Sequence, residues 1–232
     1  MTGRLGIISD AHGNGPAFLQ AIALLRKNGA ERFVFLGDAV GYIPSLDVVK
    51  ALMALGDDVR CILGNHESML LKGDSRQDEV YKLNRTRTLV GESERAFMQS
   101  WNKQIAEDAG GRRALFLHGS PKNPTNGYVY PDTDLSEFTP NADFVFMGHT
   151  HHPFVRRQGG TVFVNVGSCG LPRDDGRFGS AAIFDAGSGK AMVLRFDITE
   201  ATRESLAKTA DVHPAVRNVY KRRRDQIFGE IV

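Results

Sequence analysis

The 232-residue sequence predicts an α/β fold, because short apolar runs alternate with amphipathic segments in its first 66 residues. The apolar runs 5–8, 33–36 and 59–63 have the length of buried strands. Between them, segments 16–28 and 45–55 carry apolar residues at helical spacing, and the first begins at a proline and is followed by a glycine. This alternation indicates a largely parallel sheet built by right-handed crossovers.

Each of these three strands is followed by polar residues. Asp10 and His12 follow the first, Asp38 follows the second, and Asn65 and His66 follow the third. In parallel sheets the residues at the carboxyl ends of the strands line one crevice. We therefore expect these five side chains to lie close together.

The remainder of the chain predicts a second, mixed sheet packed on the first. Residues 72–109 are more polar, with a helix expected at 92–105. Further strands are expected at 114–117, 144–147, 161–165, 181–184 and 192–196, without long helices between them. Helical patterns at 200–208 and 214–228 end the chain. No repeat or linker divides it, so we expect one domain over 1–232 with a C-terminal helical extension at about 199–232.

Composition and charge narrow the class of protein. The chain is 41% hydrophobic and 24% charged, as in soluble globular proteins, and its formal net charge of +2 does not indicate a nucleic-acid or membrane partner. The exception is the basic stretch 221–224, which we expect to be a solvated face of the terminal helix, with an anion or partner contact as the alternative.

The two cysteines, Cys61 and Cys169, form neither a zinc-type pair nor a disulfide framework, and Cys61 lies in an apolar run that we expect to be buried. The sequence shows no signal peptide and no apolar stretch long enough to cross a bilayer. We expect a cytoplasmic protein.

Five strand ends deliver carboxylate, amide and imidazole groups to one edge of the predicted fold. They carry Asp10 with His12, Asp38, Asn65 with His66, His118, and His149 with His151. Any one of these groups alone is typical of a helix cap or a satisfied core residue. Together they suit a pair of divalent transition-metal ions, and the lack of thiolates argues against an iron–sulfur or structural zinc site. Two such cations, two aspartates and a hydroxide leave a charge of about +1, which attracts phosphate.

These motifs resemble the complete motif set of the calcineurin-like metallophosphoesterases. The matching stretches are Asp10-Ala-His12, Gly37-Asp38, Gly64-Asn65-His66-Glu67, His118-Gly119 and Gly148-His149-Thr150-His151. Segments 10–17, 37–44 and 167–174 extend the resemblance, in particular to the small single-domain bacterial and archaeal members. The resemblance implies a four-layer α-β-β-α sandwich of two mixed sheets flanked by helices.

The resemblance also implies a role for each matching residue. One metal is held by Asp10, His12, Asp38 and His151. The other is held by Asp38, Asn65, His118 and His149, so that Asp38 bridges the two ions. His66 lies beside the centre as general acid or as donor to a phosphoryl oxygen. Manganese is the expected metal, with iron, zinc, nickel and cobalt as alternatives.

The segment 149–152 contains three histidines. Side chains two residues apart in an extended segment point the same way, so we expect His149 and His151 to reach the metals. His152 then faces elsewhere, in a structural role such as a hydrogen bond that supports a neighbour.

The predicted reaction is hydrolysis of phosphomonoesters or phosphodiesters by direct in-line attack of a metal-bridging hydroxide, on small-molecule or nucleotide substrates. Loop 118–130 follows a predicted ligand and offers Lys122, Asn126 and Tyr128 to the substrate, although it can also be an ordinary connection. Arg173 can bind phosphate with its planar fork, or can form an ion pair with an acidic neighbour.

Three other functions remain open. The protein serine/threonine phosphatases of this superfamily follow Gly-Asp with Asp-Arg, whereas Gly37-Asp38 is followed by Ala39-Val40, which argues against a phosphoprotein substrate. A nuclease has only the basic stretch 221–224 in its favour. A non-catalytic scaffold would have lost ligands, and every ligand position here has the expected type. The sequence does not address the oligomeric state.

Overall fold

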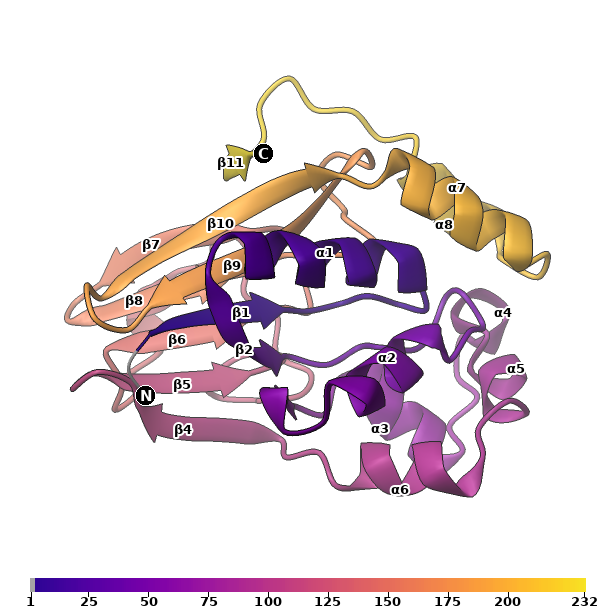
Figure 1. The fold of residues 1–232 in the computed structure, drawn as a ribbon, viewed down its shortest axis with the longest axis horizontal. Helices are drawn as coiled ribbons and strands as arrows, with labels where there is room; N and C mark the ends of the chain where they lie inside the picture. The colour runs from indigo at the N-terminus through magenta and orange to yellow at the C-terminus, as the bar shows by residue number, and fades with distance from the viewer. Residues whose placement is uncertain (1–2) are drawn as a thin grey trace.

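Two mixed β-sheets flanked by helices form the protein (Figure 1), as described by a computed structural model covering residues 3–232. The strand order is β11-β10-β9-β1-β2-β3 in the first sheet and β4-β5-β6-β8-β7 in the second. The fold class predicted from the sequence is confirmed. In chain order the elements are β1 (Arg4–Ile8), α1 (Gly15–Lys27), β2 (Ala30–Phe35), α2 (Asp47–Leu55), the 3-10 turn η1 (Gly56–Asp58), β3 (Val59–Cys61), α3 (Asn65–Lys72), α4 (Asp78–Tyr81), α5 (Leu83–Arg87), α6 (Glu92–Gln99), β4 (Gln104–Asp108), β5 (Arg113–Leu117), the 3-10 turn η2 (Leu135–Glu137), β6 (Phe144–Met147), β7 (Phe154–Gln158), β8 (Thr161–Asn165), β9 (Phe178–Asp185), β10 (Lys190–Asp197), α7 (Thr199–Lys208), α8 (Pro214–Val219) and β11 (Glu230–Ile231).

The first sheet begins with the predicted parallel strands β1, β2 and β3, connected through α1 and α2. β9 then pairs antiparallel with β1, and β10 pairs antiparallel with β9. The expectation that these two strands belong to the second sheet was wrong. β9 is buried on both faces along most of its length, because it lies inside the first sheet between β10 and β1. Ala182 of β9 lies opposite Ile7 of β1.

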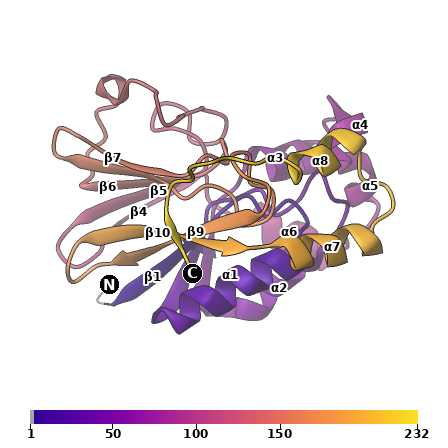
Figure 2. The ribbon, with the colours of Figure 1, turned by 90° about the horizontal axis from the view of Figure 1, so that it is seen from above.

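Alternate side chains of β1 and β2 build two separate cores. Ile7 and Val34 point towards the second sheet and pack there with residues such as Phe146. Ile8 and Phe35 point the other way, into the core beneath α1 and α2. On the outer face of the second sheet the covering element is η2 with its flanking loop, as the view from above shows (Figure 2).

Two predicted helices are shorter than expected. The helix predicted over 92–105 ends at Gln99, because residues 104–108 pair with β5 as the edge strand β4. The helix predicted over 214–228 ends at Val219. After it the main chain bonds to another loop, with the amide of Gly176 donating to the carbonyl of Arg222 at 3.0 Å, so the basic stretch is not a helix face.

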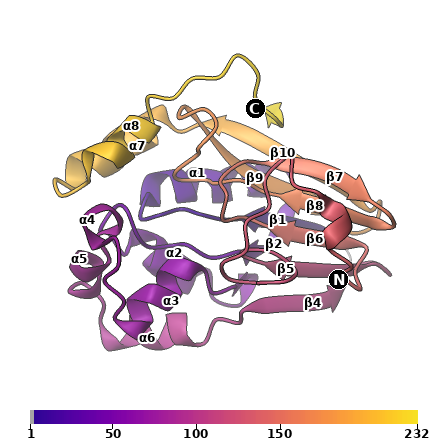
Figure 3. The same ribbon diagram turned by 180° about the vertical axis from the view of Figure 1, so that it is seen from behind.

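The short helices gather beyond one end of the sheets. α3 to α6 lie at the end towards which β1 and β2 run, and α8 lies next to α4 (Figures 1 and 3). The neighbourhood of α4 and α8 is held by an ion pair between Lys82 Nζ and Asp211 Oδ1 at 2.7 Å. None of the helices within residues 3–232 has the length and apolar character that crossing a bilayer requires.

Candidate active site

The seven predicted metal ligands lie together where strands of both sheets end. They are buried or half-buried residues that follow β1, β2, β3, β5 and β6. Three overlapping groups have ligand atoms within 4.8 Å of one another: Asp10, His12 and His151; His12, Asp38 and His66; and Asp38, His118 and His149. Asn65 joins them through its Oδ1 atom, 3.1 Å from His118 Nε2.

Main-chain amides orient both carboxylates. The N–H of His149 donates to Asp10 Oδ2 at 2.9 Å, and the N–H of His66 donates to Asp38 Oδ1 at 3.0 Å. Each aspartate therefore keeps one oxygen free to face the histidines. Asp10 Oδ1, buried and without a hydrogen bond, lies 3.2 Å from His151 Nε2, and Asp38 Oδ2 lies 3.4 Å from His118 Nε2.

Main-chain carbonyls fix the tautomers of three histidines. The Nδ1 atoms of His12, His118 and His151 contact the carbonyl oxygens of Val40, Leu36 and Leu171 at 3.0, 2.8 and 2.5 Å. Since a carbonyl only accepts, each Nδ1 carries the proton and each Nε2 of the neutral ring is a lone pair.

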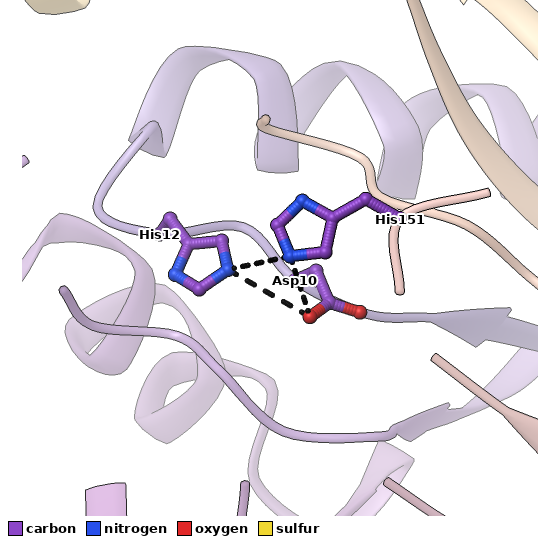
Figure 4. A group of neighbouring side chains, drawn as sticks. All are labelled: Asp10, His12 and His151. Carbon is purple, nitrogen blue, oxygen red and sulfur yellow. Dashed lines mark hydrogen bonds and ion pairs between the residues drawn. The ribbon is translucent and has the colours of Figure 1, made fainter. Parts of the chain in front are cut away.

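These lone pairs face other acceptors across very short distances. His12 Nε2 lies 3.1 Å from His151 Nε2, and both approach Asp10 (Figure 4). His118 Nε2 lies 3.1 Å from the Nδ1 atom of His149. Without a proton between them, the Nε2 atoms of His12 and His151 and the Oδ1 atom of Asp10 would repel one another, and a shared cation makes this arrangement favourable. The donor set therefore fits the metal ions that the motifs imply.

The backbone explains how the ligands converge. Five of the seven have a positive φ: Asp10 (56°), His12 (49°), Asp38 (60°), His149 (65°) and His151 (59°). Such conformations are costly outside glycine and gather at functional sites. His149 and His151 do reach the cluster, but the argument from an extended segment was wrong, because left-handed turns rather than strand alternation direct them.

Two glycines of the motifs permit close approach to the carboxylates. A Cβ atom at Gly64 would lie 2.1 Å from Asp38 Oδ1, and one at Gly148 would lie 2.4 Å from Asp10 Oδ2. Any larger residue would displace a ligand, which is the physical reason for glycine before Asn65 and before His149.

Burial and charge shift the pKa values of the histidines in the metal-free site. Burial lowers the pKa of both His149 and His151 to about 4. Burial also acts on His118, but the neighbouring Asp38 charge outweighs it and raises the pKa to about 9. Burial lowers the pKa of His66 to about 3, so its ring is neutral at pH 7.

Glu67 is a site residue to which the sequence assigned no role. Its carboxylate accepts hydrogen bonds from the main-chain amides of Asp38 (2.8 Å), Val40 (3.1 Å) and Gly64 (3.1 Å). It therefore ties the loop after β2 to the start of α3. Its position after Asn65-His66 is the available sequence signal, but only the structure shows that it holds the Asp38 loop.

A cavity of about 440 Å³ opens beside the cluster, large enough for a small organic ligand. Four of the five tyrosines of the chain line it, namely Tyr42, Tyr81, Tyr128 and Tyr130. Tyr128 and Tyr130 are exposed and lie parallel, with ring centres 6.0 Å apart, and Tyr128 packs 4.3 Å from the ring of His149. The sequence analysis gave a substrate role only to Tyr128 of these four.

The other predicted substrate residues have different positions. Arg173 lines the cavity, whereas Lys122 and Asn126 do not. Lys122 Nζ lies 3.1 Å from Glu137 Oε2, on the exposed surface of loop 118–130. His152 lies outside the metal-ligand groups and on the cavity wall, with its ring 6.0 Å from that of Tyr130.

The ion pairs of the acidic neighbours of Arg173 are made elsewhere. Asp174 binds Arg195 at 2.6 Å, and Asp175 binds Arg177 at 2.9 Å. The guanidinium of Arg173 donates instead to the hydroxyl of Tyr42 at 2.7 Å. The alternative expectation, an ion pair of Arg173 with its neighbours, is therefore wrong.

The fold and the site define a class of protein: an α/β sandwich with buried Asp and His groups that could hold metal ions, beside an open cavity of about 440 Å³. Comparison with known proteins identifies the family. The calcineurin-like phosphoesterase superfamily domain matches residues 4–189, and the chain belongs to this superfamily of metal-dependent phosphoric ester hydrolases.

Relatives from several organisms are similar along most of the chain. An uncharacterized protein of Methanocaldococcus jannaschii is 26% identical, with 97% of this chain and 96% of that protein aligned. Phosphodiesterase YfcE of Escherichia coli is 25% identical, with 73% and 81% aligned. A solved metallophosphoesterase from Sphaerobacter thermophilus has the same fold, with a TM-score of 0.78 at 20% identity over 95% of this chain and 99% of that one.

Proposed function

We propose that the protein hydrolyses phosphate esters of small molecules or nucleotides with two divalent metal ions, by direct attack of water and without a covalent enzyme intermediate. Asp10, His12, Asp38 and His151 hold one ion, and Asp38, Asn65, His118 and His149 hold the other. The overlap of the groups at Asp38 supports its bridging role, because Oδ2 is within 3.4–3.9 Å of His118, His12 and His66 nitrogens.

The metal ions, when bound, supply an activated water and offset the charge of the phosphoryl oxygens. Manganese is our first candidate, because carboxylate, amide and imidazole ligands without thiolate suit it, with iron, zinc, nickel and cobalt as alternatives.

His66 acts on the substrate rather than on the metals. Its ring lies between His12, Tyr42 and Tyr81, with ring centres 4.6–5.0 Å away, at the boundary between cluster and cavity. Because burial lowers its pKa, we assign it as a neutral hydrogen-bond donor to a phosphoryl or leaving-group oxygen, in preference to an imidazolium acid.

Arg173 and Tyr128 are the proposed substrate contacts on the cavity wall. The guanidinium fork of Arg173 suits a phosphate oxygen pair, and the exposed ring of Tyr128 offers a stacking face to a planar leaving group such as a nucleobase. Lys122 is left out, since it pairs with Glu137 outside the cavity.

One observation carries this proposal: the Nε2 atoms of His12 and His151 and the Oδ1 atom of Asp10 face one another in the buried cluster, an arrangement that suits a shared cation. The test is metal reconstitution followed by assays on phosphomonoesters, linear phosphodiesters and cyclic nucleotides. We expect close to two equivalents of metal per chain by elemental analysis and turnover that disappears with a chelator. A protein that stays metal-free after manganese loading would refute the proposal.

A further inference from the structure

The segment after α7 builds one wall of the cavity. It lies beyond residues 4–189, to which the superfamily domain matches. Ala215, Val216 and Val219 of α8 line the cavity, followed by Arg222. Val80 and Tyr81 of α4 also line the cavity and pack in one apolar cluster with Val216 and Val219.

The irregular stretch after α8 is tied down along its length. The hydroxyl of Tyr220 donates to the carbonyl of Gly170 at 2.8 Å. The amide of Gly176 donates to the carbonyl of Arg222 at 3.0 Å, and the amide of Arg224 donates to Asp175 Oδ2 at 2.9 Å. The main chain of Arg222 is therefore held in place beside the cavity before any ligand binds.

Arg222 contacts the main chain of Arg173 on this wall. Arg222 Nη1 donates to the carbonyl of Arg173 at 3.0 Å, and both side chains line the cavity. Neither forms an ion pair with a carboxylate in the part of the chain that the structure describes, 3–232.

One donor of Arg173 is left without any acceptor. Its Nε–H is buried and makes no hydrogen bond, although its Nη2 donates to Tyr42. A buried donor without a partner is costly, and a guanidinium fork is the side-chain group best matched to phosphate oxygens.

We propose that Arg173 and Arg222 form a second phosphate subsite, so that the substrate carries a phosphate group besides the one that is hydrolysed. This inference rests on the proposed function, since the metal ligands and His66 receive the scissile phosphate. The C-terminal segment then determines specificity, because it supplies Arg222 and holds Arg173.

The test uses manganese-loaded enzyme and two pairs of substrates that differ by one phosphate. The diester pair is thymidine 5′-(p-nitrophenyl phosphate) with and without a 3′-phosphate, and the monoester pair is propane-1,3-diyl bisphosphate and propyl phosphate. The measured quantity is the ratio of kcat/KM with the second phosphate to kcat/KM without it, for the pair that is hydrolysed.

We expect a ratio well above one in the native protein and a ratio about tenfold lower in Arg222→Gln, the loss of one charge-assisted contact. Arg222→Lys keeps the charge but loses the fork and should fall between them. The matched control is Arg223→Gln, which removes the same charge from an exposed neighbour whose Nη1 bonds only main-chain carbonyls; it should retain the native ratio.

The outcomes separate the two proposals. An unchanged ratio in both Arg222 variants, with turnover intact, would overturn the second subsite and leave the hydrolase assignment standing. Equal losses in Arg222→Gln and Arg223→Gln would also overturn it, since general surface charge would then be the cause. Absence of turnover on all four compounds would remove the proposed function and this inference with it.

Discussion

The metal-ligand cluster and the cavity wall differ in how they are built. The cluster is buried, its carboxylates are oriented by main-chain amides, and its imidazoles are oriented by main-chain carbonyls. The wall consists of side chains from loops and short helices that are far apart in the chain, and several are exposed, such as Tyr128 and Tyr130. On the proposed function, the chemistry takes place where strands end, and substrate choice depends on the more variable segments of the wall.

The largest effect is expected from Asp38→Asn, because Asp38 belongs to two of the three overlapping ligand groups. The amide keeps the shape but removes the charge shared by both proposed metal positions. We expect at least a thousandfold loss of kcat and a loss of bound metal by elemental analysis. Asp57→Asn, at an exposed carboxylate of η1, is the matched control and should change neither. Native metal content in Asp38→Asn would contradict the ligand assignment.

His66→Ala tests the boundary between the two regions. We expect a fall in kcat of about a hundred- to a thousandfold, the usual range for the loss of one hydrogen-bond donor to developing negative charge. The metal content should stay near normal, because Asp38 Oδ1 is held by the main-chain amide of residue 66, which alanine retains. If the variant lost its metal ions, His66 would have to be assigned as a ligand.

The metal-free cluster should lose stability in acid, because two of its histidines have lowered pKa values. His149 and His151 have folded pKa values of about 4, below the unfolded value of about 6.5. Between these pH values the unfolded chain binds more protons, so the free energy of unfolding falls as the pH drops from 6.5 to 4. One such histidine contributes about 3 kcal/mol.

The measurement is the Tm of chelator-treated protein across this pH range. His118 has the opposite sign, since its raised pKa contributes stability that is lost as the pH rises through about 9. The Lys122→Ala variant should show a parallel curve, because that side chain is exposed and lies outside the cavity. A Tm that is flat from pH 6.5 to 4 would show that the imidazoles of His149 and His151 are not buried in their neutral form in solution.

The smallest effect is expected from Tyr128→Ala on the wall. Loss of a stacking face should raise KM for aromatic or nucleotide esters about three- to tenfold, with kcat and metal content nearly unchanged. Tyr128→Phe keeps the ring and should behave as the native protein. Equal KM changes for aromatic and aliphatic esters would argue against stacking.

The site was predictable to the extent that it follows strands. Asp10, Asp38 and His118 directly follow strands whose apolar patterns are visible in the sequence, and the structure brings them together. Tyr81 and Arg222 belong to a short helix and to an irregular stretch without periodicity, so nothing local indicates that they share a cavity. The prediction that His149 and His151 point into the cluster was right, but its reason, an extended segment, was wrong. Their positive φ angles cannot be predicted from a hydrophobic pattern.

The sequence by itself determined the α/β class, the strands of the first crossovers and the residue types that could bind metal, because apolar periodicity and polar strand ends are local properties. Only the tertiary structure decided that β9 and β10 join the first sheet, that β4 replaces the end of a predicted helix, and that the chain after Val219 crosses to the cavity. Those outcomes depend on hydrogen bonds and burial between segments distant in sequence, which no local pattern encodes.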